Sequence, residues 1–187
     1  YSAEEGSLVM KDGQIEDVRW REHIESMAQG ESWGAMVLTE PDAGSDLGAL
    51  RARATQAEDG SWRINGEKIF ITSGHGQHQI VLARTDDPND PQGLDGLSLF
   101  WVPRVIERDG ETIHNIRLTK VEKKVGHNSS PTCSLLYENS EAELIGQPGE
   151  GFKLMLKLMN NARVAVGFES LGLCEQAYRM ATQFAGQ

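Results

Sequence analysis

Hydrophobic and polar positions follow three successive patterns along the chain. The first has a helical period and covers 17–29, with Gly30 as its stop signal. From Trp33 onward the apolar positions alternate with a period of two, which is typical of strands. The helical period returns at Gly151 and continues to the end of the chain, which predicts one long helix there.

Short strands are expected through the middle of the chain, between clusters of Gly, Asp, Asn and Pro. The expected strands cover 35–39, 51–57, 62–68, 79–84, 97–103, 113–118, 132–137 and 142–145. Residues 1–16 show little periodicity and are expected to be loop or extended chain. Because no helices separate the strands, the pattern predicts a mainly β fold, an antiparallel barrel or sandwich, with flanking helices.

Composition narrows the function classes. The net charge of −10 over 187 residues argues against a nucleic-acid binder, which needs a basic face. No apolar run is long enough for a membrane span. The two cysteines, Cys133 and Cys174, are too few for a disulfide framework and indicate reduced thiols in a cytoplasmic protein. The chain starts at Tyr1 without a signal-peptide pattern, and both ends are expected to be cuts through a larger protein.

Two segments carry the clearest chemical signal. The first, Met36 to Asp46, reads MVLTEPDAGSD, and the second, Asn65 to Ser73, reads NGEKIFITS. The first ends in a turn whose Gly permits close backbone approach and whose N–H groups and Ser hydroxyl suit a diphosphate. In a strand, Phe70 and Thr72 lie on the same face. A ring beside a hydrogen-bonding residue suits a flat heterocycle.

Together the two segments resemble the flavin-contacting motifs of the acyl-CoA dehydrogenase family, in the family's order and at a typical spacing. The segment from Lys120 to Cys133 is similar to the family's turn into the last hairpin of its barrel. The segment from Gly146 to Lys153 is similar to the family's Gly-rich start of the C-terminal bundle. The residues 130–133 (SPTC) and 68–74 (KIFITSG) resemble those of the larger bacterial members, a branch that includes enzymes acting on methylthiopropanoyl-CoA.

The resemblance implies a domain order. Residues 1–33 would be the tail end of an N-terminal helical domain, and 34–148 the middle antiparallel β-barrel domain. Residues 149–187 would be the first helix of a C-terminal helical bundle, with the remainder of the bundle absent from this chain.

The resemblance also implies FAD as cofactor and an acyl-CoA as substrate. The implied FAD-binding residues are Met36, Leu38, Thr39, Gly44, Ser45, Phe70, Ile71 and Thr72. The implied substrate-binding residues are Ser45, Asn160 and Arg163. Alternatives stay open, since Leu38 and Ile71 would be core residues in any barrel, and Arg163 could form a structural ion pair. One flavin must meet both motifs, so Thr39, Ser45 and Thr72 are expected to line one concave surface.

The family's reaction removes an α-proton with a carboxylate base and passes the β-hydrogen as hydride to the flavin. No residue of the chain is assigned as that base. Ala162 stands where a minority of members carry it, so the base is expected beyond Gln187. An electron-transfer flavoprotein is the implied electron acceptor, and the implied assembly is a homo-oligomer. The chain alone is expected to bind FAD weakly and to be inactive.

Other readings differ in how well the residues fit. Gly146 and Gly151 have the spacing of a phosphate-binding loop, but Phe152 stands where that loop needs Lys. His75 and His78 lack a third ligand nearby, so no metal site is expected. The remaining alternatives are an acyl-CoA oxidase or a flavin-dependent hydroxylase on the same scaffold, and a non-enzymatic ligand-binding barrel.

Overall fold

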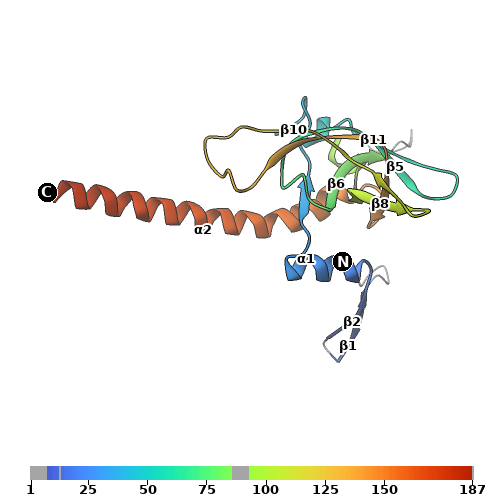
Figure 1. Ribbon diagram of the computed structural model, residues 1–187, viewed down its shortest axis with the longest axis horizontal. Helices are drawn as coiled ribbons and strands as arrows, with labels where there is room; N and C mark the ends of the chain where they lie inside the picture. The colour runs from blue at the N-terminus through green and yellow to red at the C-terminus, as the bar shows by residue number, and fades with distance from the viewer. Residues whose placement is uncertain (1–7, 13, 86–92, 187) are drawn as a thin grey trace. The chain divides into compact units, whose positions relative to one another are not determined.

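The computed structural model describes residues 8–12, 14–85 and 93–186 (Figure 1). The chain divides into two compact units, 1–152 and 153–187, and each is described here by itself.

The first unit contains a seven-stranded sheet that closes on itself. Its strands are β3 (Gly34–Val37), β4 (Arg53–Gln56), β5 (Trp62–Thr72), β6 (His78–Thr85), β7 (Leu97–Pro103), β10 (Arg117–Val121) and β11 (Thr132–Ile145). Hydrogen-bonded pairs run from β5 through β4, β6, β7 and β11 back to β5. The predicted barrel is therefore confirmed, and β3 and β10 extend the sheet beyond the closed ring.

Two pairings in this barrel are parallel, β3 with β6 and β4 with β6, whereas the others are antiparallel. In the sheet, β4 lies between β5 and β6. The chain therefore crosses over β4 on its way from β5 to β6, and β6 runs in the same direction as β4. Alternation along each strand shows which face is buried but not which strands are neighbours, so the sequence did not predict this mixture.

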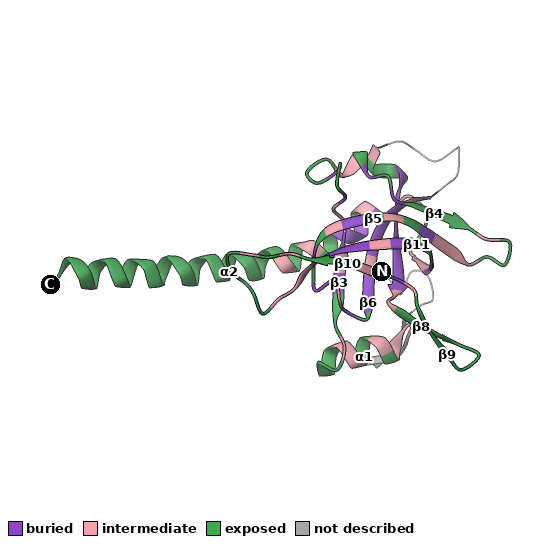
Figure 2. Cartoon of the chain, turned by 45° about the horizontal axis from the view of Figure 1, so that its top comes forward, coloured by how far each residue is buried: buried purple, intermediate pink, exposed green. Residues whose placement is uncertain are grey.

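The barrel core is formed by the inward-facing half of each strand, as the period of two requires. Figure 2 shows buried residues along β5, β6 and β11 and exposed residues along most of α2. The fully buried core includes Val37, Ala54, Ile64, Val81, Ala83, Phe100, Val102 and Cys133. Removal of this apolar surface from water is the main force that stabilises the barrel.

The start of the chain differs from the expected helix over 17–29. Gln14–Val18 is strand β2, paired with β1 (Leu8–Lys11), and helix α1 covers only Arg21–Gln29. Trp20, with φ of 61°, reverses the chain between β2 and α1. The prediction of loop or extended chain over 1–16 holds for this hairpin, and residues 1–7 lie outside the described part.

Three other strand predictions need correction. The expected strand 113–118 is divided between β9 (Glu111–His114), paired with β8 (Val105–Arg108), and β10. Asn115 causes the break, because its side-chain amide donates to Pro103 O (2.8 Å) and Glu141 O (2.9 Å). Strand β8 was not expected. The expected strands 132–137 and 142–145 form one strand, β11, with an irregular register around Asn139, whose φ is 56°.

Helix α2 covers Gly151–Ala185 and begins at the predicted residue. At its first residue, a Cβ would lie 2.4 Å from the carbonyl carbon of Ser98, so only glycine fits beside β7. Within the described residues, no helix combines the length and hydrophobicity that crossing a membrane requires.

Candidate functional site

The first motif begins on β3 and ends in a tight turn at the surface. Glu40 N donates to Ala43 O (2.9 Å) and Ala43 N donates to Glu40 O (3.2 Å), which closes the turn. The chain then folds back, so that a Cβ on Gly44 would lie 3.8 Å from Thr39 Cγ2. Gly44 and Ser45 are both exposed. The turn therefore presents backbone and a hydroxyl group beside Thr39.

The second motif lies directly beside the first. Ile69 N on β5 donates to Thr39 O over 2.9 Å, a contact between segments 30 residues apart in the chain. Here Phe70 adopts a φ of 58°, which is unusual for a residue with a side chain. Its ring is 60% exposed, Thr72 is exposed, and Ile71 between them is buried. Phe70 and Thr72 thus lie on the outer side, and Ile71 is a core residue, as its alternative reading expects.

The third segment, Lys120 to Cys133, continues the same region. Thr132 pairs with Thr72 across β11 and β5, and Ser73 N donates to Pro131 O over 2.8 Å. Segments that are far apart in the sequence are therefore neighbours around the end of β5.

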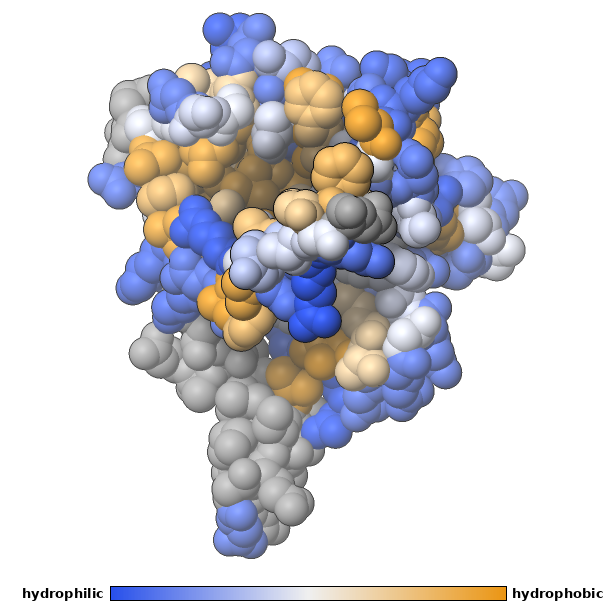
Figure 3. Space-filling view, turned by 90° about the vertical axis from the view of Figure 1, so that its left-hand side faces the viewer, coloured by the Kyte–Doolittle hydropathy of each residue, from blue (hydrophilic) through white to orange (hydrophobic). Residues whose placement is uncertain are grey.

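Strand β3 offers a second, apolar side to this region. Ala35 and Val37 point into the core, whereas Met36 and Leu38 alternate with them and are half-buried. β3 is also the last strand of its sheet, so one of its edges is not covered by another strand of that sheet. Figure 3 shows one face of the molecule on which apolar side chains lie open among polar ones. An edge strand with half-buried apolar side chains can receive a flat ligand that needs backbone hydrogen bonds.

The sequence matches the family described as "Acyl-CoA dehydrogenase, middle domain" over residues 35–140. The chain belongs to the acyl-CoA dehydrogenase family.

Two relatives and two solved structures show the extent of the likeness. The chain is 39% identical over 173 residues to 3-methylmercaptopropionyl-CoA dehydrogenase of Ruegeria pomeroyi, covering 87% of the chain and 29% of that protein. It is 37% identical over 179 residues to a broad-specificity linear acyl-CoA dehydrogenase of Mycobacterium tuberculosis, covering 85% and 28%. The chain thus spans less than a third of these curated relatives.

Among solved structures, butyryl-CoA dehydrogenase from Megasphaera elsdenii matches with a TM-score of 0.60 and 32% identity, over 71% of this chain and 33% of that one. Acyl-CoA dehydrogenase from Geobacillus kaustophilus matches with a TM-score of 0.62 and 26% identity, over 83% and 38%.

Inside this acyl-CoA dehydrogenase barrel, the two motifs share a buried ion pair that the sequence did not predict. Lys68 Nζ lies 2.9 Å from Glu40 Oε1, with the lysine side chain 0% exposed and the glutamate side chain 6% exposed. Burial lowers the pKa of Lys68 to about 8, against the opposing effect of the Glu40 carboxylate. In sequence, both charged residues look like surface residues. The available signal was their position inside the motifs, since Glu40 follows Thr39 and Lys68 stands two residues before Phe70.

Arg84 of β6 supports the chain that follows the first motif, and it too was missed. Its Nε donates to Leu50 O (2.8 Å) and its Nη2 to Gly93 O (3.0 Å) and Gly48 O. Gly48 lies in the short 3₁₀ helix η1 (Leu47–Ala49), Leu50 follows that helix, and Gly93 begins the 3₁₀ helix η2 (Gly93–Gly96). One arginine therefore fixes the backbone just after Ser45.

The family's implied substrate residues on α2 belong to the second unit. Arg163 Nη1 donates to Asn160 Oδ1 over 3.1 Å, and both side chains are exposed. This contact joins residues one turn apart and pairs the guanidinium with an amide. Their place relative to the motif segments stays a prediction.

Aromatic and imidazole rings join α1 to the barrel. His23 lies 4.8 Å from both His78 and Trp101, measured between ring centroids. The Nδ1 atoms of His75 and His78 are buried without a hydrogen-bond partner. Burial, and then the nearby His23, lower the pKa of His78. Among the described residues, no group of three or more His, Cys, Asp or Glu side chains could hold a metal ion.

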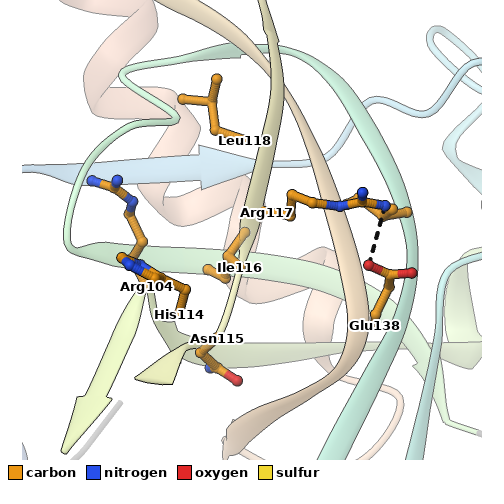
Figure 4. A pocket seen from close by; sticks show the side chains of 8 residues that line it. Arg104, His114, Asn115, Ile116, Arg117, Leu118 and Glu138 are labelled. Carbon is orange, nitrogen blue, oxygen red and sulfur yellow. Dashed lines mark ion pairs between the residues drawn. The ribbon is translucent and has the colours of Figure 1, made fainter. Parts of the chain in front are cut away.

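A pocket of about 510 Å³ opens beside β10 (Figure 4). Its lining residues are Arg104, His114, Asn115, Ile116, Arg117, Leu118, Leu136 and Glu138. Arg117 and Glu138 form an ion pair of 3.2 Å there. None of the residues implied to contact FAD lines this pocket.

Proposed function

We propose that this chain is the flavin-binding barrel of an enzyme that oxidises an acyl-CoA thioester to its α,β-unsaturated form with FAD. The observation that carries the proposal is the 2.9 Å hydrogen bond from Ile69 N to Thr39 O, which brings both motifs to one exposed region. A non-enzymatic barrel would not need a surface assembled from these two segments.

The residues present fit a flavin. The exposed ring of Phe70 and the half-buried Met36 and Leu38 offer apolar contacts to a flat heterocycle. Thr39 and Thr72 add hydroxyl groups, and the uncovered edge of β3 adds backbone groups for the polar edge of the ring. Because Gly44 has no side chain, the turn leaves room beside Thr39 for a diphosphate that would meet Ser45. Ile71, which is buried, contributes through its backbone.

Each part has a separate task in the reaction. When bound, the flavin supplies the redox chemistry by accepting the β-hydrogen as hydride. The barrel residues orient the ring and exclude water from one side of it. In the proposal, Ser45, Asn160 and Arg163 hold the acyl-CoA.

The base that removes the α-proton is proposed to lie outside residues 1–187. Glu40 is unsuited to that task, because its carboxylate already accepts hydrogen bonds from Lys68 Nζ, Arg51 N and Ala52 N. A group so engaged is poorly placed to take a proton from substrate.

Electron transfer and assembly follow the family in the same proposal. A chain of the solved structure described as the electron transferring flavoprotein of Acidaminococcus fermentans is 35% identical to this one, with a TM-score of 0.59 over 71% of this chain and 33% of that one. As the family resemblance implies, we propose an electron-transfer flavoprotein as acceptor and a homo-oligomer as the working form. The domain boundaries at 33/34 and 148/149 are part of the proposal.

The test is FAD titration of the protein at its full natural length, followed by an acyl-CoA-dependent dye-reduction assay. FAD binding with turnover supports the dehydrogenase. Rapid reoxidation by oxygen without a dye indicates an oxidase. A folded protein that binds no FAD would refute the proposal and favour a non-enzymatic barrel.

A variant tests the second motif. Thr72→Pro removes a backbone donor and strains β5, so it should lower the amount of FAD bound. Thr112→Pro on β9 is the matched control, because β9 pairs with β8 in a separate two-stranded sheet that carries neither motif. Undiminished FAD content in Thr72→Pro, with the protein folded, would count against the assigned role.

A further inference from the structure

We propose that the buried Glu40–Lys68 ion pair is the positioning element that fixes the two motif segments against each other. Neither residue would touch the flavin; both would act through Thr39 and Phe70. The inference rests on the proposed FAD function and adds residues that the motif resemblance assigned no task.

The ammonium group of Lys68 is fixed in direction. It can donate three hydrogen bonds, and it has three acceptors: Leu38 O at 2.8 Å, Glu40 Oε1 at 2.9 Å and Leu82 O at 2.7 Å. Leu38 and Glu40 flank Thr39 in the first motif, and Leu82 lies on β6. A single side chain therefore holds β5 to the residues on both sides of Thr39.

The carboxylate of Glu40 holds the chain that follows the first motif. Its Oε2 accepts from Arg51 N at 2.6 Å and its Oε1 accepts from Ala52 N at 3.0 Å. Because Arg51 and Ala52 follow the exposed turn, both ends of that turn are attached to one carboxylate. The turn carries Gly44 and Ser45, so its position depends on Glu40.

The same contacts extend to the exposed ring of the second motif. Phe70 stands two residues after Lys68. The residue between them, Ile69, donates its N–H to Thr39 O. With Lys68 held in the core, the φ of 58° at Phe70 turns the ring outward. A shift of Lys68 would therefore change the distance between Phe70 and Thr39.

The energetics favour a positioning task over a stabilising one. Desolvation offsets most of the attraction in a buried ion pair, and well-packed apolar replacements are often equally stable. An ion pair differs from an apolar pair in having fixed directions for its hydrogen bonds. Loss of the ion pair should therefore lower FAD affinity by more than the accompanying loss of folding stability can explain.

The experiment measures FAD affinity and unfolding separately in the protein at its full natural length. Glu40→Gln keeps the shape of the side chain but places an amide N–H group where one of the carboxylate's acceptor oxygens stands. Glu40→Asp keeps the charge but is too short to reach Lys68 and both backbone donors together. FAD dissociation constants are determined by titration at a temperature where circular dichroism shows each variant fully folded.

We expect both variants to weaken FAD binding by about tenfold or more, since a displacement of about 1 Å in a binding group has effects of this size. Lys68→Met and the double variant Glu40→Gln/Lys68→Met complete a double-mutant cycle. Their losses should be strongly non-additive, because the two residues act as one unit.

Asn115→Ala is the matched control. It also removes a side chain with three hydrogen bonds to backbone, at Pro103 O, Glu141 O and Glu141 N, but it lies away from the motifs. It should lower the unfolding temperature and leave FAD affinity unchanged. Equal FAD affinity in wild type, Glu40→Gln and Glu40→Asp would overturn the positioning task while leaving the FAD proposal intact. A folded wild type that binds no FAD would overturn both.

Discussion

The barrel and helix α2 use hydrophobic residues in opposite ways. In the barrel, alternation places Ile64, Val81 and Phe100 in a core where each is 0% exposed. On α2, Phe168, Leu171 and Phe184 remain 71%, 64% and 79% exposed. A closed sheet buries its apolar face by itself, whereas a single helix cannot. The comparison predicts different responses to equivalent substitutions in the two regions.

The largest difference should come from removing a phenylalanine ring. Phe100→Ala leaves a cavity in the barrel core and should destabilise the fold by about 3–5 kcal/mol. Phe168→Ala removes an exposed ring from α2 and should change stability by less than about 0.5 kcal/mol. Urea denaturation of each variant measures the difference. Equal losses would show that the α2 ring is buried in solution, against some other surface.

Replacing a glycine by alanine should change the folding stability in opposite directions in the two regions. In Gly66→Ala, the new Cβ would lie 2.7 Å from Ala52 Cβ, and the φ of 151° strains any side chain. We expect a loss of about 1–3 kcal/mol from such overpacking.

Gly167→Ala places the methyl group in open space on α2 and should stabilise the helix by about 1 kcal/mol. Circular dichroism during heating measures both glycine variants. A gain of stability in Gly66→Ala would show that the backbone at Ala52 moves to accept the methyl group.

Acid should weaken the barrel where α1 packs on it. The pKa of His78 is lowered by burial and by His23, so the folded state binds this proton less readily than the unfolded state. The stabilising contribution of His78 is therefore complete above the unfolded pKa of about 6.5 and is lost as pH falls through the lower folded value.

The unfolding free energy, measured by urea denaturation between about pH 7.5 and about pH 5, should fall more in wild type than in His78→Gln. Parallel curves for the two proteins would contradict the assignment to His78.

The smallest effect should come from a surface ion pair on α2. Arg179 Nε lies 2.5 Å from Glu175 Oε1, one turn away, and both side chains are exposed. Arg179→Gln should lower helix stability by only about 0.3–0.5 kcal/mol, and added salt should reduce that difference. A loss as large as that from Phe100→Ala would mean that Arg179 has a further partner.

Alternation and breaker residues predicted most of the barrel, because the inward half of each strand must be apolar. The predictions were wrong where a side chain redirects the backbone, as Asn115 does between β9 and β10. The parallel pairing of β6 with β4 was not predictable from any single strand. It depends on which strands become neighbours after closure.

The site was predicted less completely than the fold. The motif resemblance selected the segments that the structure brings together, and Phe70 is exposed as a ligand-facing ring should be. Glu40 and Lys68 were missed because charged side chains are almost never fully buried without a partner, and the partner stands 28 residues away. Sequence distance conceals such a pair, and only the pairing of the segments reveals it.

Closure of the ring also sets an order of events during synthesis. β5 pairs with β11, and β7 pairs with β11 as well, so the last strand of the barrel joins two earlier edges at once. Until Thr132–Ile145 has left the ribosome, the growing chain presents β5 and β7 as open strand edges. Such edges invite pairing with other chains, so a translational pause before β11 would favour aggregation, and a pause after it would favour folding.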